Sequence, residues 1–489
     1  MGVWRCVSKS VEIAGMDDIA QTSLRKLLSQ IGLADSDAGG TISIHGEEPV
    51  VPSRHRLGTA SAVALAAQGT AIAAIWRQRS GRGQTVDVDL CQAAMPGLCT
   101  SEHLSQSGHP LYGGRDPAMV ANFFAAKDGR RLYILRAPAY VPHMLRLLEF
   151  LGCANTTEAI AAVVARWRSD ELEEALAERK IIGTIARTRE EWLAHPQGQW
   201  LAARPPVEIE KIGDSPPEPF APAARPLSGI RVLDMAHVLA GPVTSRVLAE
   251  QGADVLHVSA PHQPDQFTYV LDTGIGKRRA FVDLDRGEAA QIQTLAADAD
   301  IFVHSWRPGS LERHGLSVAE LARRRPGLIY VTVSCYGYGG PWAARGGYEP
   351  IGQTASGLAI AEGSPERPIL APTFTLNDYV TAYLAAAGTL GALLRRAREG
   401  GSYHVKASLT RTSMWVQELG RLPQELWPDR SRGQPPLPSP RPSDMMHTAS
   451  VFGEIGHPSP ITRFSETKAF WEKPPQPAGA SRPEWLPRG

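Results

Sequence analysis

The chain has 489 residues, and its 51 Lys and Arg nearly balance its 50 Asp and Glu, for a formal net charge of +1. This length exceeds what one hydrophobic core organises, so we expect two or more domains. The balanced charge argues against a field that attracts nucleic acid or an anionic membrane, and a small-molecule partner is expected.

The cysteines and the apolar segments bear on location. Five cysteines are scattered without a CxxC pair or zinc-type histidine spacing, so we expect reduced thiols, no metal site and a cytoplasmic protein. The first ten residues lack the apolar run of a signal peptide. The Ala-rich stretches are interrupted at Gln68 and Gly388, and we therefore expect no membrane-spanning segment.

The N-terminal part contains one half of an internal repeat. Residues 1–50 form a divergent segment, whereas within residues 51–105 the run from Gly69 to Gly81 is answered, 319 positions later, by Gly388 to Gly400. Each copy predicts an Ala-rich helix, a glycine stop and then a strand. Two similar helices arising by chance remain an alternative, although the matching glycine and strand weaken it.

The middle of the chain predicts a small α+β domain and a linker. Residues 106–213 contain a hairpin pattern around Asp128 and Gly129, followed by three amphipathic helical patterns. Residues 214–225 follow, and four prolines between positions 214 and 222 suit an extended linker.

Residues 226–420 alternate strand and helix patterns, which predicts an α/β fold with a doubly wound, Rossmann-like parallel sheet. The expected strands lie at 230–234, 253–258, 280–283, 301–304 and 328–333. Residues 421–489 are rich in Pro, Ser and Arg, and we expect this tail to be loosely ordered or draped on another domain.

The first strand of this sheet leads into a candidate ligand-binding loop. Residues 226–242 read as strand, loop and helix start, with Gly241 and Pro242 at the turn. Open α/β sheets bind ligands at such strand ends, where helix amides can hold phosphate. By itself a plain tight turn explains the loop better, because G-x-G-x-x-G is missing, which also argues against a nicotinamide dehydrogenase.

Further motifs follow in order: Gly252-Ala-Asp-Val, Gly276-Lys-Arg, the run from Ser305 to Gly315, Tyr336-Gly-Tyr-Gly-Gly-Pro, and Arg345-Gly-Gly-Tyr. In this order and spacing they resemble the family III coenzyme A transferases, strongly over residues 226–417 and faintly over 54–210. The resemblance implies a CoA-binding and catalytic domain at 226–420. The family's small domain here precedes that domain, as in the inner part of a tandem fusion.

The resemblance implies that Asp378 is the nucleophile, although an Asp before a helix is otherwise usually an N-cap, and both roles are compatible. Guanidinium groups would bind the phosphates of CoA, although solvated surface charge is the alternative for them. Glycines beside Tyr348 would let the pantetheine arm approach closely, although an ordinary turn competes. The implied CoA-binding residues are His237, Leu239, Ala240, Val282, Asp283, Leu284, Ser305, Trp306, Arg307, Arg313, Arg345, Gly346, Gly347 and Tyr348. Trp306 could instead be a core residue.

Gly113 and Gly114 are the candidate lid over the reacting groups, although a surface turn explains them equally well. Three features depart from the family pattern. Ser259-Ala-Pro stands where a polar contact to the nucleotide is usual, and Ser305 replaces an asparagine. The repeat places Thr59 opposite Asp378, so the first copy lacks a nucleophile.

The resemblance therefore predicts a CoA-transferase that moves CoA between an acyl-CoA and a carboxylic acid through an aspartyl intermediate. The CoA thioester is a substrate, and no permanently bound cofactor is expected. A homodimer, possibly interlocked, is implied by analogy. One alternative is a 2-methylacyl-CoA racemase, which would need a His-Asp pair where this chain has Tyr348 and Glu349. Another is an inactive acyl-CoA-binding subunit, suggested by Thr59.

Overall fold

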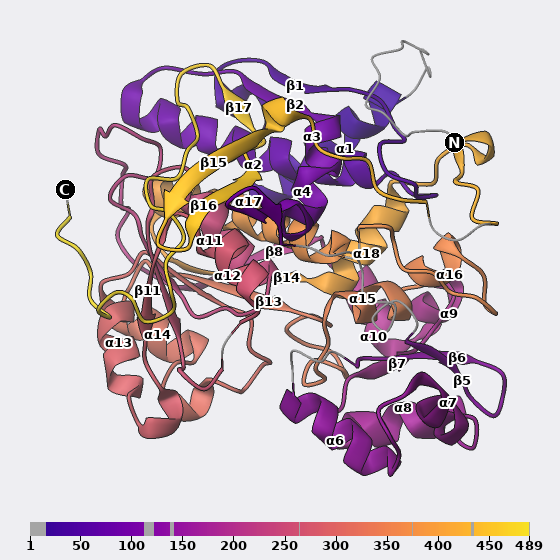
Figure 1. The fold of residues 1–489 in the computed structure, drawn as a ribbon. Coiled ribbons are helices and arrows are strands. Elements are labelled where there is room, and N and C mark those ends of the chain that lie inside the picture. Colours follow the sequence, from indigo (N-terminus) through magenta and orange to yellow (C-terminus); the bar gives the residue numbers. More distant parts are fainter. Residues whose placement is uncertain are drawn as a thin grey trace.

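The computed structural model describes residues 16–111, 122–136, 141–263, 265–373, 375–431 and 435–488. Within these residues the chain forms a central seven-stranded sheet with helices packed against it. A small α+β unit lies at one end of the molecule, at the lower right in Figure 1, and the C-terminal residues run back over the N-terminal ones.

The central sheet has the strand order β11-β10-β9-β12-β13-β14-β8. All neighbours are parallel except β8, which pairs antiparallel with β14. The bounds are β9 Arg231–Asp234, β10 Asp254–Ser259, β11 Lys277–Phe281, β12 Ile301–His304, β13 Ile329–Ser334, β14 Ser402–Ser408 and β8 Val207–Gly213. The six parallel strands have doubly wound order, and the order reverses between β9 and β12, where such sheets bind ligands. The predicted parallel α/β sheet is confirmed.

Helices cover both faces of this sheet because successive strand residues point to opposite sides. Val232 faces the larger core, beside α11 (Ala240–Ala249) and α17 (Leu376–Glu399). Its neighbour Leu233 faces a second core with α13 (Ala289–Ala297) and α14 (Val318–Arg324). Both faces are therefore apolar, as a buried parallel sheet requires.

The third strand of the sheet begins earlier than its sequence indicates. We expected it at 280–283, but β11 starts at Lys277 and includes Arg278 and Arg279. Charged residues normally argue against a buried strand, but here Arg278 pairs with Asp254 on the adjacent β10 and Lys277 pairs with Asp234 on β9, one strand further on. Ion pairing between strands thus allows charged residues at the start of β11, ahead of the predicted strand.

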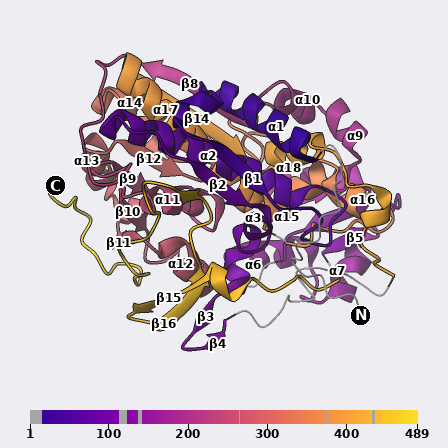
Figure 2. The ribbon, with the colours of Figure 1, turned by 90° about the horizontal axis from the view of Figure 1, so that it is seen from above.

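The internal repeat has a structural basis. Helix α2 (Leu57–Ser80) and helix α17 pack against each other in the middle of the molecule, and each ends at a glycine with a positive φ angle, Gly81 and Gly400 (Figure 2). A side chain at Gly69 would meet Val86 at 2.5 Å, and one at Gly388 would meet Val405 at 3.0 Å. Because both valines are also 319 positions apart, the two copies share one helix-on-strand contact.

The expectation that Gln68 breaks an apolar run long enough to span a membrane is wrong for helix α2, whereas α17, which contains Gly388, is not among the described helices that are long and apolar enough. Helix α2 runs through Gln68, and α17 runs through Gly388, because both positions are buried in the helix packing. Helix α2 is long and apolar enough to cross a membrane, with a mean hydropathy of 1.4 in its most apolar window. That window is completely buried inside the molecule, as in the core helix of a globular fold.

The small α+β unit contains the predicted hairpin. Strands β5 (Phe123–Ala125) and β6 (Arg131–Ile134) pair antiparallel, and β7 (Gly183–Ile185) pairs with β6. The helices are α6 Val141–Leu151, α7 Thr157–Val164, α8 Ser169–Glu178, α9 Arg189–Ala194 and α10 Pro196–Ala202. Strand β8 lies inside the range predicted for the small domain but forms the edge of the central sheet. Residues 214–225 then contain neither helix nor strand.

The C-terminal tail is ordered where the structure describes it. Strand β16 (Gly453–Pro458) pairs with β15 (Met445–Ser450) and with β3 (Ser105–Gln106), and β17 (Arg463–Phe464) pairs with β2 (Val86–Asp89). The remaining N-terminal elements are α1 Met16–Ile31, β1 Ile42–His45, α3 Leu90–Ala94, α4 Pro96–Cys99 and β4 His109–Pro110. The tail is therefore draped over the first copy, seen in yellow over indigo in Figure 1.

Candidate active site

A cavity of about 370 Å³ opens at the carboxyl ends of β9 to β12. Its position beside the reversal of strand order is where doubly wound sheets bind ligands. The lining residues are Lys180, Met235, Val258, Ser259, Ala260, Gln263, Val282, Asp283, Leu284, Asp285, Trp306, Arg307, Gly309, Ser310, Leu311, Arg313 and His314. The volume falls in the range of small-molecule sites.

Six of the residues predicted for CoA binding line this cavity together: Val282, Asp283, Leu284, Trp306, Arg307 and Arg313. They come from two segments, one after β11 and one after β12. Arg307 and Arg313 are exposed at the cavity, so their guanidinium groups can reach a phosphate. Trp306 is half-buried, and its indole Nε1 donates a hydrogen bond to the backbone oxygen of Met235 (3.0 Å).

The loop after β9 lies directly behind Trp306. The His237 ring packs against the Trp306 indole at a tilt of 39°, with centroids 4.6 Å apart, and Ser305 Oγ accepts a hydrogen bond from the His237 backbone N–H (3.0 Å). Leu239 and Ala240 are buried at the start of α11 and do not line the cavity. His237 and Ser305 thus hold the ring that could face a ligand.

A buried cluster of charged and polar side chains, centred on Asp234 at the end of β9, packs under this loop. Asp234 Oδ2 accepts hydrogen bonds from Lys277 Nζ (2.8 Å) and Ser245 Oγ (2.5 Å), and His257 Nδ1 lies 3.2 Å away. Lys277 Nζ also donates to the backbone oxygen of Pro242 (2.7 Å). Burial alone would raise the pKa of Asp234, but the Lys277 charge and His257 hold it well below its usual range. The cluster joins β9, β10, β11 and α11 under the cavity.

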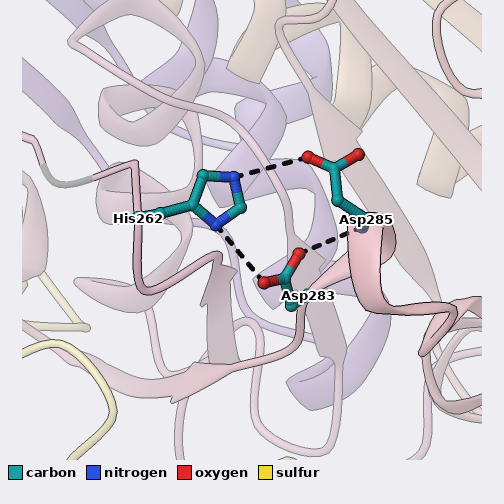
Figure 3. A group of neighbouring side chains, drawn as sticks. All are labelled: His262, Asp283 and Asp285. Atoms are coloured by element: carbon teal, nitrogen blue, oxygen red, sulfur yellow. Dashed lines mark hydrogen bonds and ion pairs between the residues drawn. The ribbon is translucent and has the colours of Figure 1, made fainter.

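A second polar cluster, His262 with Asp283 and Asp285, lies at the cavity rim (Figure 3). His262 Nδ1 is 3.3 Å from Asp283, and its Nε2 is 3.4 Å from Asp285. Arg286 approaches Asp283 (3.5 Å) and Arg313 approaches Asp285 (3.9 Å), which leaves these carboxylates less negative toward any cation. Arg313 therefore lies beside this cluster at the rim.

Lys180 was missed by sequence reasoning. It lies in the turn after α8 of the small α+β unit, in a left-handed conformation (φ 57°), yet it lines the same cavity as Arg307 and Arg313. No motif marked it, because only the tertiary packing of the small unit against the sheet brings it there. It adds a third cation to the walls.

The segment 345–348 leads from the cavity to the end of β13. The Arg345 guanidinium is paired with Glu174 of α8 (2.6 Å) and lies over the Trp342 ring, so it fastens the segment to the small α+β unit. A β-carbon at Gly346 would lie 3.8 Å from Arg307 Nη1, in ordinary contact. One at Gly347 would lie 2.3 Å from Cys335 Sγ, closer than any real contact.

This contrast predicts different outcomes for two neighbouring glycines. We expect Gly347→Ala to push the segment away from Cys335 and to lower the free energy of unfolding by roughly 1–3 kcal/mol. Gly346→Ala is the matched control and should change stability little. Thermal or urea unfolding of both variants measures this, and equal effects would show that close packing on Cys335 is unimportant.

Asp378 is the third residue of α17, at the edge of the sheet that carries the cavity. The N-cap of this helix is Thr375, so the alternative that Asp378 caps it is wrong. The Asp378 side chain is 8% exposed, and no hydrogen-bond or ion-pair partner for its carboxylate occurs among the residues that the structure describes. Burial raises the pKa of Asp378 to about 7. An unpartnered, desolvated carboxylate of this kind is typical of a reactive group.

The neighbours of Asp378 connect it with segment 345–348. Its charge helps to raise the pKa of Tyr348 and of Cys335, although burial is the larger cause for both groups. Glu349, the first residue of α15 (Glu349–Ala355), accepts a hydrogen bond from the backbone N–H of Asn377 (3.0 Å). The start of α17 is thus held in place while the Asp378 carboxylate stays unengaged within the described chain.

The equivalent position in the first copy is chemically different. The Thr59 hydroxyl and backbone N–H both donate to Glu48 Oε1, at 3.2 and 2.8 Å. Each repeat helix therefore begins over a buried glutamate, but only the second copy presents a carboxylate of its own. The predicted lid glycines, Gly113 and Gly114, lie outside the described residues.

Comparison with known proteins agrees with this geometry. The sequence model described as CoA-transferase family III matches residues 30–216 and 227–449, which is most of the chain. The chain belongs to CoA-transferase family III. The family III match falls in two parts that meet near the Pro-rich linker, and the second part contains Asp378 and every lining residue of the cavity except Lys180.

Three family III relatives illustrate the similarity. Acetyl-coenzyme A transferase nodX of Hypoxylon pulicicidum is 30% identical over 340 residues, covering 64% of this chain and 57% of the relative. A probable fatty acyl-CoA transferase of Mycobacterium tuberculosis, Rv3272, is 31% identical over 263 residues, covering 51% of this chain and 65% of the relative. The alpha subunit of the succinyl-CoA–L-malate CoA-transferase of Chloroflexus aurantiacus is 36% identical over 190 residues, covering 36% of this chain and 44% of the relative. The matches span less than two thirds of each relative's length.

Proposed function

We propose that this protein transfers CoA between an acyl-CoA and a carboxylic acid, with Asp378 as the nucleophile. The observation that carries the proposal is the buried Asp378 carboxylate, which lacks a partner among the described residues at the carboxyl edge of a doubly wound sheet. A carboxylate that is stripped of water and unpaired is a stronger nucleophile than one in solution.

The reaction divides into two exchanges. An Asp378 oxygen attacks the thioester carbon, the carbon–sulfur bond breaks, and a mixed anhydride and the CoA thiolate result. The thiolate then attacks the Asp378 carbonyl carbon and expels the donor carboxylate, which leaves an aspartyl-CoA thioester. The acceptor carboxylate reverses both exchanges and leaves as the new acyl-CoA.

The cavity at β9 to β12 supplies the binding energy in this proposal. Lys180, Arg307 and Arg313 line it and would hold the phosphates of the nucleotide end by charge-assisted hydrogen bonds. Gly346 and Gly347 would let the pantetheine arm pass toward Asp378. The small α+β unit contributes Lys180 and the Glu174 contact to Arg345, so both parts of the chain would be needed.

An exchange assay tests the proposed function. The purified protein is incubated with acyl-CoA donors and a panel of carbon-13-labelled carboxylates, and new labelled acyl-CoA is measured by mass spectrometry. The proposal predicts label in acyl-CoA without ATP. Tight binding of acyl-CoA with no exchange for any acid would instead favour a catalytically inactive binding subunit.

The raised pKa of Asp378 predicts the pH dependence. Only the ionised carboxylate attacks, and it is the form present above the pKa of about 7. We expect kcat/KM for acyl-CoA to fall about tenfold for each pH unit below 7 and to level off above it. A pH profile that is flat from pH 5 to 8 would contradict a titrating Asp378.

A further inference from the structure

A second cavity, of about 470 Å³, lies away from the candidate active site. It lies between the segment ahead of α2, the start of α9, the end of α16 (Leu358–Glu362) and the end of α18 (Leu409–Glu418). Helices α9 and α16 are at the right-hand side of Figure 2. Its lining residues are Arg54, His55, Thr188, Arg189, Glu190, Gly357, Ile360, Ala361, Gly363, Ser364, Pro365, Gln417 and Arg421. Neither Asp378 nor any residue predicted for CoA binding is among them.

The wall of this cavity is built around a buried carboxylate. Glu362 is fully buried and accepts hydrogen bonds from Ser53 Oγ (2.7 Å), the Arg54 backbone N–H (3.0 Å) and Arg430 Nη2 (2.6 Å). His55 Nδ1 lies 2.6 Å from the same carboxylate. Burial would raise the pKa of Glu362, but His55 and Arg430 lower it to about 2. The charge of Glu362 is therefore already matched inside the wall.

Three arginines line the cavity without an ion-pair partner in the described part of the chain. In the described part of the chain, Arg54, Arg189 and Arg421 have no carboxylate within ion-pair distance, whereas Arg430 is paired with Glu362. Arg54 donates Nη1 to two backbone oxygens, and its buried Nε has no acceptor among these residues. Glu190 is the one acidic residue in the lining. The cavity therefore carries an excess of positive charge.

Two of the three arginines, Arg54 and Arg421, lie near the same aromatic ring. The Arg54 and Arg421 guanidinium groups lie 4.8 and 6.0 Å from the centre of the Trp427 ring. His55 and Arg421 form an isolated antiparallel bridge, which fixes the two backbones side by side. Because His55 Nδ1 is hydrogen-bonded to Glu362, a ligand in the cavity would contact the other ring nitrogen of His55, Nε2. Guanidinium groups gathered in one cavity favour oxyanions.

We propose that this cavity is an anion-binding site for a small, doubly charged oxyanion, bound by Arg54, Arg189, Arg421 and His55. Phosphate and dicarboxylates share this chemistry, because both offer paired oxygens to guanidinium groups. The site lies at the start of α2, where the first copy has Thr59 in place of a nucleophile. It is independent of Asp378 and does not depend on the proposed transferase reaction.

Isothermal titration calorimetry of the full chain tests the site, with inorganic phosphate and succinate as separate probes. At least one probe should bind to the wild type, and the double variant Arg189→Gln/Arg421→Gln should weaken that binding at least about tenfold. Both side chains are exposed, so the fold should persist. Whichever of the two probes binds shows whether the ligand is a phosphate or a carboxylate.

Two controls separate this site from the catalytic one. Arg166→Gln removes another exposed arginine that has no ion-pair partner in the described chain, and it should leave binding unchanged. Asp378→Asn should also leave phosphate or succinate binding at this cavity unchanged. If neither probe binds, or if the double variant binds as tightly as the wild type, the proposed site is wrong.

Discussion

Replacing Asp378 by Asn should abolish CoA exchange, with kcat lowered about 10⁴-fold or more, because an amide cannot form the anhydride or the thioester. The substitution keeps the size of the side chain, so the cavity at β9 to β12 should bind acyl-CoA as before. Steady-state kinetics together with calorimetric binding of acyl-CoA measures both quantities.

The same variant should also change how the free energy of unfolding depends on pH. The raised pKa means that folded wild type keeps a proton that the unfolded chain releases between about pH 4 and 7, so wild-type stability falls as pH rises through this range. Asn carries no such cost, and above pH 7 Asp378→Asn should be the more stable protein, by up to about 4 kcal/mol. Retained exchange, or a loss of stability at pH 8, would contradict the role and the buried state of Asp378.

Removing the charge of Lys277 should lower the free energy of unfolding by about 3–5 kcal/mol, because Lys277→Met leaves Asp234 ionised and buried without its partner. Lys277 and Asp234 are 1% and 0% exposed, so water cannot replace the lost contact. The first turn of α11 would also lose the hydrogen bond that Lys277 donates to the Pro242 backbone oxygen. Urea unfolding measures the effect, and acyl-CoA binding should weaken with it.

Two further variants make this prediction specific. Lys406→Met breaks a more exposed pair with Glu210 and should cost less than about 1 kcal/mol. The double variant Lys277→Met/Asp234→Asn removes the stranded charge and should recover much of the stability. If Lys277→Met were as mild as Lys406→Met, the buried cluster would not be what holds the loop.

The sequence could predict the parts of the fold that depend on local patterns. Strand and helix alternation indicated the parallel sheet, and the 319-residue offset indicated the two repeat helices α2 and α17, although not that they pack together. The charged start of β11 was missed because Lys277 and Arg278 find their acids on other strands. The pairing of β8 with β14 joins segments about 190 positions apart, and no local pattern indicates it.

The candidate site shows the same division. Motif order indicated Trp306, Arg307 and Arg313, which the structure brings to one cavity, but Lys180 enters only because the small α+β unit packs against the sheet. The second cavity draws its arginines from three distant segments. Arg54, Arg189 and Arg421 look like ordinary surface charges in the sequence, and only tertiary structure makes them neighbours.

A covalent bond between Asp378 and CoA can be detected by peptide mass spectrometry after rapid quenching. Protein mixed with an acyl-CoA should carry CoA, as a thioester, on the peptide that contains Asp378. Hydroxylamine should convert this adduct to a hydroxamate at the same residue. Turnover that continues while the Asp378 peptide stays unmodified, or while the adduct forms on another residue, would contradict the account.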